Sequence, residues 1–191
     1  MAEATRVADD DRDHPEIGRV ARRRLDADLV RDPAAGEVAI RLAASADVIA
    51  RAVPFAALDA VLAELGDLAG KTIIDCTNPM SAAVPEGSAA KKIAAARPAA
   101  HVVKSFNGQG FETLAAPIVG GTPASNFDCG DDAGAKATVR QLVADVGLDP
   151  VDAGALENAR LLETLAALWF TTTAAFGTRR TAFRVLRESA K

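Results

Sequence analysis

The sequence is poor in the residues that most often mark metal and disulfide sites. Of its 191 residues, two are cysteines (Cys76 and Cys129) and two are histidines (His14 and His101). Two histidines are too few for a histidine-based metal centre, so we expect no metal site. Two cysteines in a chain of this length favour free thiols and a cytoplasmic location, where thiols stay reduced.

Long apolar runs and a strong excess of one charge are also missing. No run approaches the roughly 18 residues that a membrane-spanning helix requires. The acidic opening MAEATRVADDDRD lacks the apolar centre of a signal peptide. The formal net charge of −4 gives no sign of a nucleic-acid-binding surface. We therefore expect neither a membrane nor a nucleic acid as partner, and look for a small-molecule ligand.

What the sequence does contain is an alternation of strand-like and helix-like patterns. Segments with a continuous apolar centre, such as KTIIDCTNP at 71–79 and AHVVKSFN at 100–107, are typical of strands buried on both faces. The expected strands lie at 4–8, 28–30, 47–55, 71–79, 100–107, 117–121, 125–130 and 148–154. Helical patterns lie between them, at 17–25, 36–46, 56–70 and 133–146, with Asp131 and Asp132 placed to cap the last. This alternation predicts an α/β fold with a mostly parallel sheet and helices on both faces.

The last long segment differs from the others. From Leu156 to Phe176 the chain is apolar nearly all round, which is typical of a buried helix. Its few polar residues form a rim, which we interpret as an internal network: Glu157, Asn158, Arg160 and Glu163. We expect Trp169 and Phe170 to pack against the rest of the protein.

Three consecutive expected strands end in small or polar residues, at the sheet edge where ligands bind in such folds. These residues are Ala52, Val53 and Pro54; Thr77, Asn78 and Pro79; and Lys104, Ser105, Phe106 and Asn107. An Asn side chain offers one acceptor and two donors, which suits a carboxamide or a flat heterocycle. A single Asn in such a place is more often a turn residue. Because two Asn and one Lys occur at the same edge, a binding site and a set of separate turns are equally good interpretations.

Arg31 follows the second expected strand. In a dinucleotide-binding fold this position meets the adenosine ribose, where an arginine accommodates a 2′-phosphate. A surface charge in the R-D-P turn explains the residue equally well.

Two charged residues, Arg51 and Asp128, fall inside expected strands. A lone buried charge is costly, so each requires a partner or an exposed edge. Nowhere does the sequence suggest an acid–base pair or an activated nucleophile, and we assign no catalytic residue.

The segments AVPF, IIDCTNPM, VVKSFNGQGFETL and AFRVLR occur in this order between Ala46 and Arg187, together with a distinctive run from Gly130 to Trp169. They resemble the F420-dependent NADP oxidoreductase family, also called NADPH-dependent F420 reductases. The resemblance implies a Rossmann-type doubly wound domain over residues 1–153 and a small C-terminal helical extension over 154–191. It also implies hydride transfer between NADP(H) and coenzyme F420, with NADP as cofactor and F420 as candidate co-substrate.

The resemblance also implies which residues hold the cofactor. Those on the nicotinamide side would be Ala52, Val53, Pro54, Thr77, Asn78 and Asn107. Arg31 would meet the 2′-phosphate, because RDP at 31–33 is similar to the S-R-D-P of the family, although Val30 replaces the serine.

The glycine loop of the family, G-x-G-x-x-G, is degenerate here. Its third glycine aligns with Gly18, its first with Asp13 and its second with Pro15. Pro15 has no N–H to donate. A carboxylate ~6 Å from a phosphate charge costs about 3 kcal/mol at an effective dielectric near 20. Proline and acids stabilise a helix start, so we expect a well-capped helix with a weakened pyrophosphate site.

Three hypotheses follow. The first is an NADP-dependent oxidoreductase of the F420-reductase type. The second is a non-catalytic relative that has lost dinucleotide binding, and the third is an NADPH reductase with a different acceptor. The apolar final helix also suggests a homodimer, with its contact around Leu161 to Phe170.

Overall fold

The computed structural model describes residues 43 and 45–188, which lie within the unit Ala39–Lys191 of the chain. The predictions that fall before residue 43 lie outside the described residues. They are the first two strands, the degenerate glycine loop, Gly18 and Arg31. The predicted domain boundary between 153 and 154 stays a prediction.

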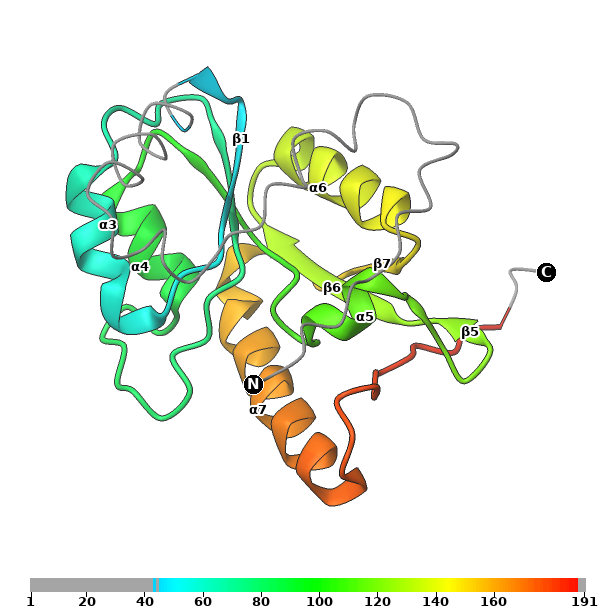
Figure 1. The fold of residues 1–191 in the computed structure, drawn as a ribbon. Helices are drawn as coiled ribbons and strands as arrows, with labels where there is room; N and C mark the ends of the chain where they lie inside the picture. Colours follow the sequence, from blue (N-terminus) through cyan, green and yellow to red (C-terminus); the bar gives the residue numbers. More distant parts are fainter. Residues whose placement is uncertain (1–42, 44, 189–191) are drawn as a thin grey trace, which may run out of the picture. The chain divides into compact units, whose positions relative to one another are not determined.

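A five-stranded sheet forms the centre of the described part (Figure 1). Its strands are β1 (Val48–Arg51), β2 (Thr72–Asp75), β3 (His101–Lys104), β6 (Ser125–Gly130) and β7 (Asp149–Asp152), which lie side by side in the order β1-β2-β3-β6-β7. Strands β1, β2 and β3 are parallel to each other, β6 and β7 are parallel to each other, and β3 pairs with β6 in antiparallel orientation. The predicted α/β class with a mostly parallel sheet is confirmed, and the antiparallel pair is a feature that the sequence did not reveal.

The continuous apolar runs are explained by burial on both faces. All four residues of β2 are buried. Ile73 belongs to one hydrophobic cluster and Ile74 to the other, and Val102 and Val103 on β3 divide in the same way. Successive side chains of a strand point to opposite faces, so a central strand covered on both sides is apolar at successive positions of its middle, whereas Thr72 and Asp75 at the ends of β2 are buried and polar.

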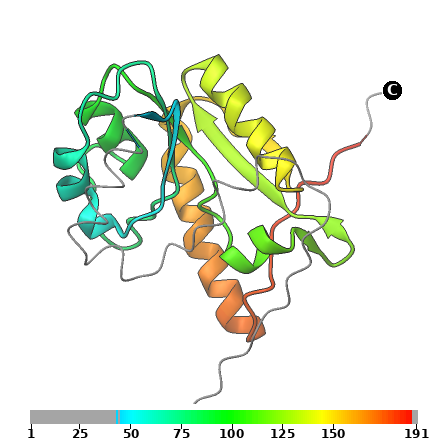
Figure 2. The same cartoon turned by 45° about the horizontal axis from the view of Figure 1, so that its top comes forward.

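Helices cover both faces of the sheet (Figure 2). They are α3 (Leu58–Glu64), α4 (Ala89–Ala96), α5 (Phe111–Ala115), α6 (Ala133–Asp145) and α7 (Ala159–Phe176), with short 3-10 turns at η1 (Phe55–Ala57) and η2 (Leu156–Asn158). Helices α3, α4 and the start of α7 bury apolar residues on one face, and α6 does so on the other. The sequence did not predict α4 or α5. The predicted strand at 117–121 is instead a small separate hairpin of β4 (Ile118–Val119) and β5 (Thr122–Pro123).

Helix ends follow the expected capping chemistry. The Asp132 side chain accepts a hydrogen bond from the Ala135 N–H at 2.7 Å, which confirms the predicted cap of α6. Helix α7 ends at Gly177, whose φ of 64° lies in the left-handed region that glycine adopts without strain. None of the described helices is long and apolar enough to cross a membrane.

A C-terminal segment, residues 178–188, returns from α7 along the sheet edge. The Ser125 N–H donates to the Phe183 carbonyl at 2.9 Å, and the Arg180 guanidinium donates to the carbonyls of Glu112, Ala116 and Ile118. Trp169 of α7 is buried, and its indole N–H donates to the Thr181 carbonyl at 2.8 Å. These contacts fasten the segment to α5, β6 and α7.

Candidate functional site

The ends of β1, β2 and β3 come together at one edge of the sheet. In the strand register, Arg51 lies beside Asp75, and Asp75 lies beside Lys104. The segments that follow these three residues, beginning at Ala52, Cys76 and Ser105, are therefore neighbours. This arrangement brings together six of the eight residues that the sequence predicted for a ligand; the other two, Gly18 and Arg31, lie outside the described residues.

Asn78 and Asn107 connect the second strand end to the third. The Asn78 side-chain amide donates to the Asn107 carbonyl at 2.9 Å, and the Asn107 amide donates to Asn78 Oδ1 at 2.9 Å. Asn107 also donates to the Leu162 carbonyl of α7 at 2.9 Å. The amide groups therefore hold the two strand ends together. These asparagines have the structural role of turn residues and also lie at the predicted binding edge.

Several polar groups of this asparagine pair have no hydrogen-bond partner among the described residues. They include two donors, the backbone N–H groups of Asn78 and Asn107, and two acceptors, the Asn78 carbonyl and Asn107 Oδ1. One donor and one acceptor are what a carboxamide requires for recognition.

Thr77 is held by three charged residues of the sheet. Its N–H donates to Asp75 Oδ1 at 3.1 Å, and its hydroxyl oxygen accepts from Arg51 Nη2 at 3.1 Å. Its carbonyl accepts a hydrogen bond from Lys104 Nζ. Each polar group of this residue is therefore bonded to a member of the row Arg51, Asp75 and Lys104.

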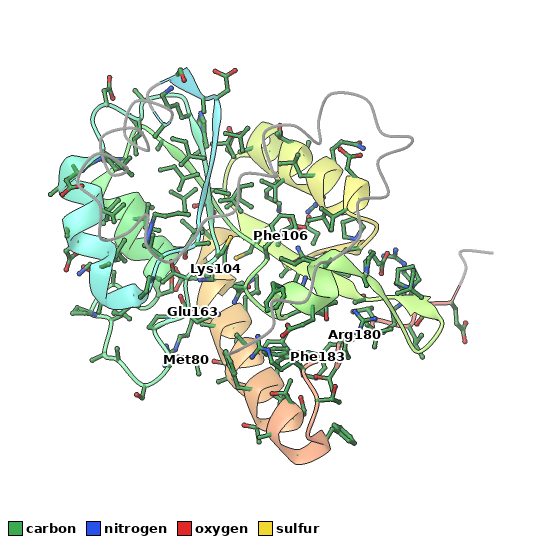
Figure 3. All side chains as sticks on the ribbon, viewed as in Figure 1. Met80, Lys104, Phe106, Glu163, Arg180 and Phe183 are labelled. Carbon is green, nitrogen blue, oxygen red and sulfur yellow. The ribbon has the colours of Figure 1, made fainter. Side chains whose placement is uncertain are left out.

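Lys104 is fully buried, with no exposed surface. Its ammonium donates to Asp75 Oδ2 at 2.8 Å and to the Thr77 carbonyl, and it lies 3.4 Å from Glu163 Oε1 (Figure 3). An ammonium has three donors, and three acceptors surround this one. Lys104 thus faces α7 and not the ligand edge, although its position in the sequence suggested a ligand contact.

Glu163 completes this buried cluster from α7. Its Oε1 accepts from the Ala89 N–H at the start of α4 at 2.8 Å, where the helix dipole favours a carboxylate. Burial raises its pKa, and Lys104 opposes that shift. The internal network predicted for this helix is confirmed for Glu163. Trp169 is buried as predicted, whereas Phe170 is 42% exposed.

The two charged residues inside strands have different partners. Arg51 bonds to the Thr77 hydroxyl and has Asp75 nearby, and burial lowers its pKa. Asp128 is buried and pairs with Arg140 of α6 at 3.1 Å; burial raises its pKa. Both charges are compensated within the described part, as the cost of burial requires.

Two non-glycine residues near the strand ends have left-handed backbone conformations. Met80 has φ 55° and Phe106 has φ 54°. Such strained residues collect at ligand sites. Met80 is 46% exposed and lines an open groove of about 560 Å³ with Ser81, Ala167, Phe170 and Thr171. Met80 stands two residues after Asn78, and three of the other lining residues belong to α7. Figure 3 shows Met80 beside this helix.

The described part has side chains that can bind a ligand, but no evident catalytic group. Burial raises the pKa of both Cys76 and Cys129 to about 12, so neither thiol is an activated nucleophile at neutral pH. No group of three or more potential metal ligands is present among the described residues. Such a site can orient a redox cofactor and a second molecule, with the reaction carried by the two ligands.

The charged row is the part of the site that sequence reasoning missed. Part of the signal was available in the sequence: Arg51, Asp75 and Lys104 stand three, four and three residues before the ends of their polar segments. Aligning the three segments by these ends would have placed the charges within one position of a common row. What they bond to depends on α7, which is distant in sequence.

Comparison with known proteins gives a consistent result. The family described as "NADP oxidoreductase coenzyme F420-dependent" matches residues 21–79. A crystal structure from Arthrobacter sp. FB24, assigned as an F420-dependent NADP-reductase, is 32% identical with a TM-score of 0.71. The match covers 78% of this chain and 73% of that one.

Two more distant proteins share part of the chain. The metalloreductase STEAP3 of Rattus norvegicus is 35% identical over 108 residues, which is 54% of this chain. The chain spans only 22% of the length of that relative. A reductive aminase of Aspergillus terreus, solved in complex with NADPH, is 22% identical over 73% of this chain and 46% of its own, with a TM-score of 0.54. At that identity the likeness concerns the fold alone.

Proposed function

Since the chain belongs to the family of NADP oxidoreductases that depend on coenzyme F420, we propose that it is an enzyme that transfers a hydride between NADP(H) and a second redox carrier. The observation that carries the proposal is the joined strand ends of β2 and β3, which leave unpaired donors and acceptors at the sheet edge where the small apolar residues 52–54 follow β1.

These residues fit the nicotinamide end of the cofactor. The Asn78 N–H and Asn107 Oδ1 would bind the carboxamide oxygen and nitrogen. Ala52, Val53 and Pro54 would present a small apolar surface to one face of the ring. Bound NADP(H) would supply the hydride. The protein's part is to hold the ring at the sheet edge and to exclude water from it.

The phosphate end of NADP(H) would be bound by residues outside the described part. We propose that Arg31 binds the 2′-phosphate and Gly18 lies at the pyrophosphate turn, despite the acids around it. Arg31 would then be the source of a preference for NADPH over NADH, because an arginine at this position accommodates the 2′-phosphate.

For the acceptor we propose coenzyme F420 or a similar flat carrier. The support is the family relationship and the groove between Met80 and Phe170, which continues from the nicotinamide residues. A cytoplasmic location accords with both carriers and with the two free thiols.

Calorimetry with NADPH, and with NADH as control, tests the proposal. We expect micromolar NADPH binding that exceeds NADH binding. Asn107→Ala removes the acceptor and one of the two hydrogen bonds between the strand ends, while the bond from Asn78 to the backbone carbonyl of residue 107 remains. We expect it to weaken NADPH binding about tenfold or more, as for two lost hydrogen bonds. Gln109→Ala, which removes a bond to Asn126 on the other face of the sheet, serves as the matched control.

Each outcome separates the hypotheses. If the folded protein binds neither nucleotide, it is a non-catalytic relative. If it binds NADPH but fails to reduce F420 while reducing another acceptor, the third hypothesis holds. Turnover with F420 supports the first.

We also propose that the protein is a homodimer joined through α7. Leu161 and Leu168 are 65% and 51% exposed, and because they stand seven positions apart on α7 they lie on the same side of the helix. Light scattering should give twice the 19.7 kDa mass of the chain. Leu161→Glu together with Leu168→Glu should give a folded monomer, and a monomeric wild type would contradict the proposal.

A further inference from the structure

Burying charged side chains in a protein core carries a large desolvation cost in free energy. Arg51, Asp75 and Lys104 are 4%, 0% and 0% exposed, and Glu163 joins them from α7. Well-packed apolar residues often give equal or greater stability than such buried ion pairs. The four charges balance, two positive and two negative, so the cluster does not require a ligand charge. The cluster therefore contributes through the groups that it holds in place.

What it holds is the backbone of Thr77. Asp75 accepts from its N–H, Lys104 donates to its carbonyl, and Arg51 donates to its hydroxyl. In a trans peptide the carbonyl and the following N–H point in opposite directions. With the Thr77 carbonyl directed at Lys104 in the interior, the N–H of Asn78 must point away from the cluster.

We propose that Lys104 is a positioning residue that fixes the peptide between Thr77 and Asn78 and so presents the Asn78 N–H to the ligand. The inference rests on the proposed function for the identity of that ligand, the carboxamide of NADP(H). The ammonium also polarises the peptide to which it is bonded, and hydrogen bonds in such chains strengthen one another. Lys104 therefore affects the strength of the Asn78 donor as well as its direction.

Two variants distinguish positioning from general support. Glu163→Gln keeps the Lys104 bonds to Asp75 and Thr77, and its amide oxygen can still accept from the Ala89 N–H. It leaves two buried cations against one carboxylate, so we expect a lower unfolding midpoint. In the folded protein it is the matched control for the loss of the Glu163 charge. Lys104→Met combined with Glu163→Gln removes the donor to the Thr77 carbonyl. It leaves Arg51 and Asp75 as a balanced ion pair, so we expect the double variant to be more stable than Lys104→Met alone.

The first measurement is the amide resonance of Asn78 in ¹⁵N-labelled protein without ligand. We expect it at the wild-type position in the control and displaced or broadened in the double variant, while resonances of α6 and β7 stay unchanged. The second is the NADPH dissociation constant. We expect it within about twofold of wild type in the control and about tenfold or more weaker in the double variant, the effect of one charge-assisted hydrogen bond.

The two proposals fail in different ways. If the wild type binds no NADPH, the proposed function fails and the amide resonance still tests positioning. A folded double variant with an unchanged Asn78 resonance and unchanged NADPH affinity overturns the inference. If the double variant does not fold, wild-type protein decides: a coupling across the hydrogen bond from Lys104 Nζ to the Thr77 carbonyl carbon is expected, and its absence overturns the inference.

Discussion

Replacing Lys104 alone by methionine should lower the free energy of unfolding by about 3–5 kcal/mol. The side chain is fully buried, and its ammonium is bonded to Asp75 and close to Glu163. Methionine leaves two buried carboxylates against a single remaining cation. Breaking a buried ion pair in this way costs about 3–5 kcal/mol, out of roughly 5–15 kcal/mol for a typical domain. Thermal unfolding followed by circular dichroism should show a midpoint lowered by roughly 10 °C or more.

Lys91→Met is the matched control for this loss. Lys91 lies on α4, and its ammonium pairs with Glu157 at 2.7 Å on the surface. Exposed pairs of this kind contribute about 0–1 kcal/mol. The midpoint of this control should therefore stay close to that of the wild type. Equal unfolding midpoints for the two methionine variants would show that the buried cluster contributes no more than a surface pair.

Trp169→Ala should be nearly as damaging, for a different reason. The indole is 2% exposed, and its N–H bonds to Thr181. Arg179 lies over the ring at 5.1 Å from its centroid. Truncating a buried tryptophan to alanine costs about 3–5 kcal/mol. Because the same ring anchors the C-terminal segment, we expect trypsin to cut the variant faster at its arginines, which include Arg180 and Arg184.

Trp169→Phe divides the effect into its parts. Phenylalanine keeps most of the apolar volume and the stacking partner of Arg179, and it loses the hydrogen bond to Thr181. Only about 1 kcal/mol should be lost with that bond. Trypsin cleavage as slow in the alanine variant as in the wild type would mean that the segment is held by Arg180 and Ser125 instead.

Much of the fold could be predicted because its signals are local. The continuous apolar pair Ile73 and Ile74 in β2 indicates burial on both faces, and Asp132 indicates a helix start within three residues of itself. Helix α4 was missed because its sequence, AAKKIAAA, has one large apolar residue and buries mainly alanine. The antiparallel pairing of β3 with β6 depends on a connection through α5 and a hairpin, and no short pattern encodes it.

The position of the site in the fold could be predicted from the sequence, but the contacts of its residues could not. Strand ends fixed the position of Thr77, Asn78 and Asn107. The role of Lys104 could not be predicted, because a lysine at the end of a strand is equally suited to a ligand phosphate and to an internal carboxylate. Its partner Glu163 lies 59 positions away along the chain, and only packing of α7 against the sheet brings the two together.

The chain has one tryptophan, and it lies where the final helix meets the returning C-terminal segment. Its ring is shielded from water, so its fluorescence emission should be shifted to short wavelengths while the segment is in place. The protein therefore carries its own optical label at a position distant in sequence from the proposed nicotinamide residues. Detachment of the segment, whether by urea or by a binding partner, can be followed in real time without adding a dye.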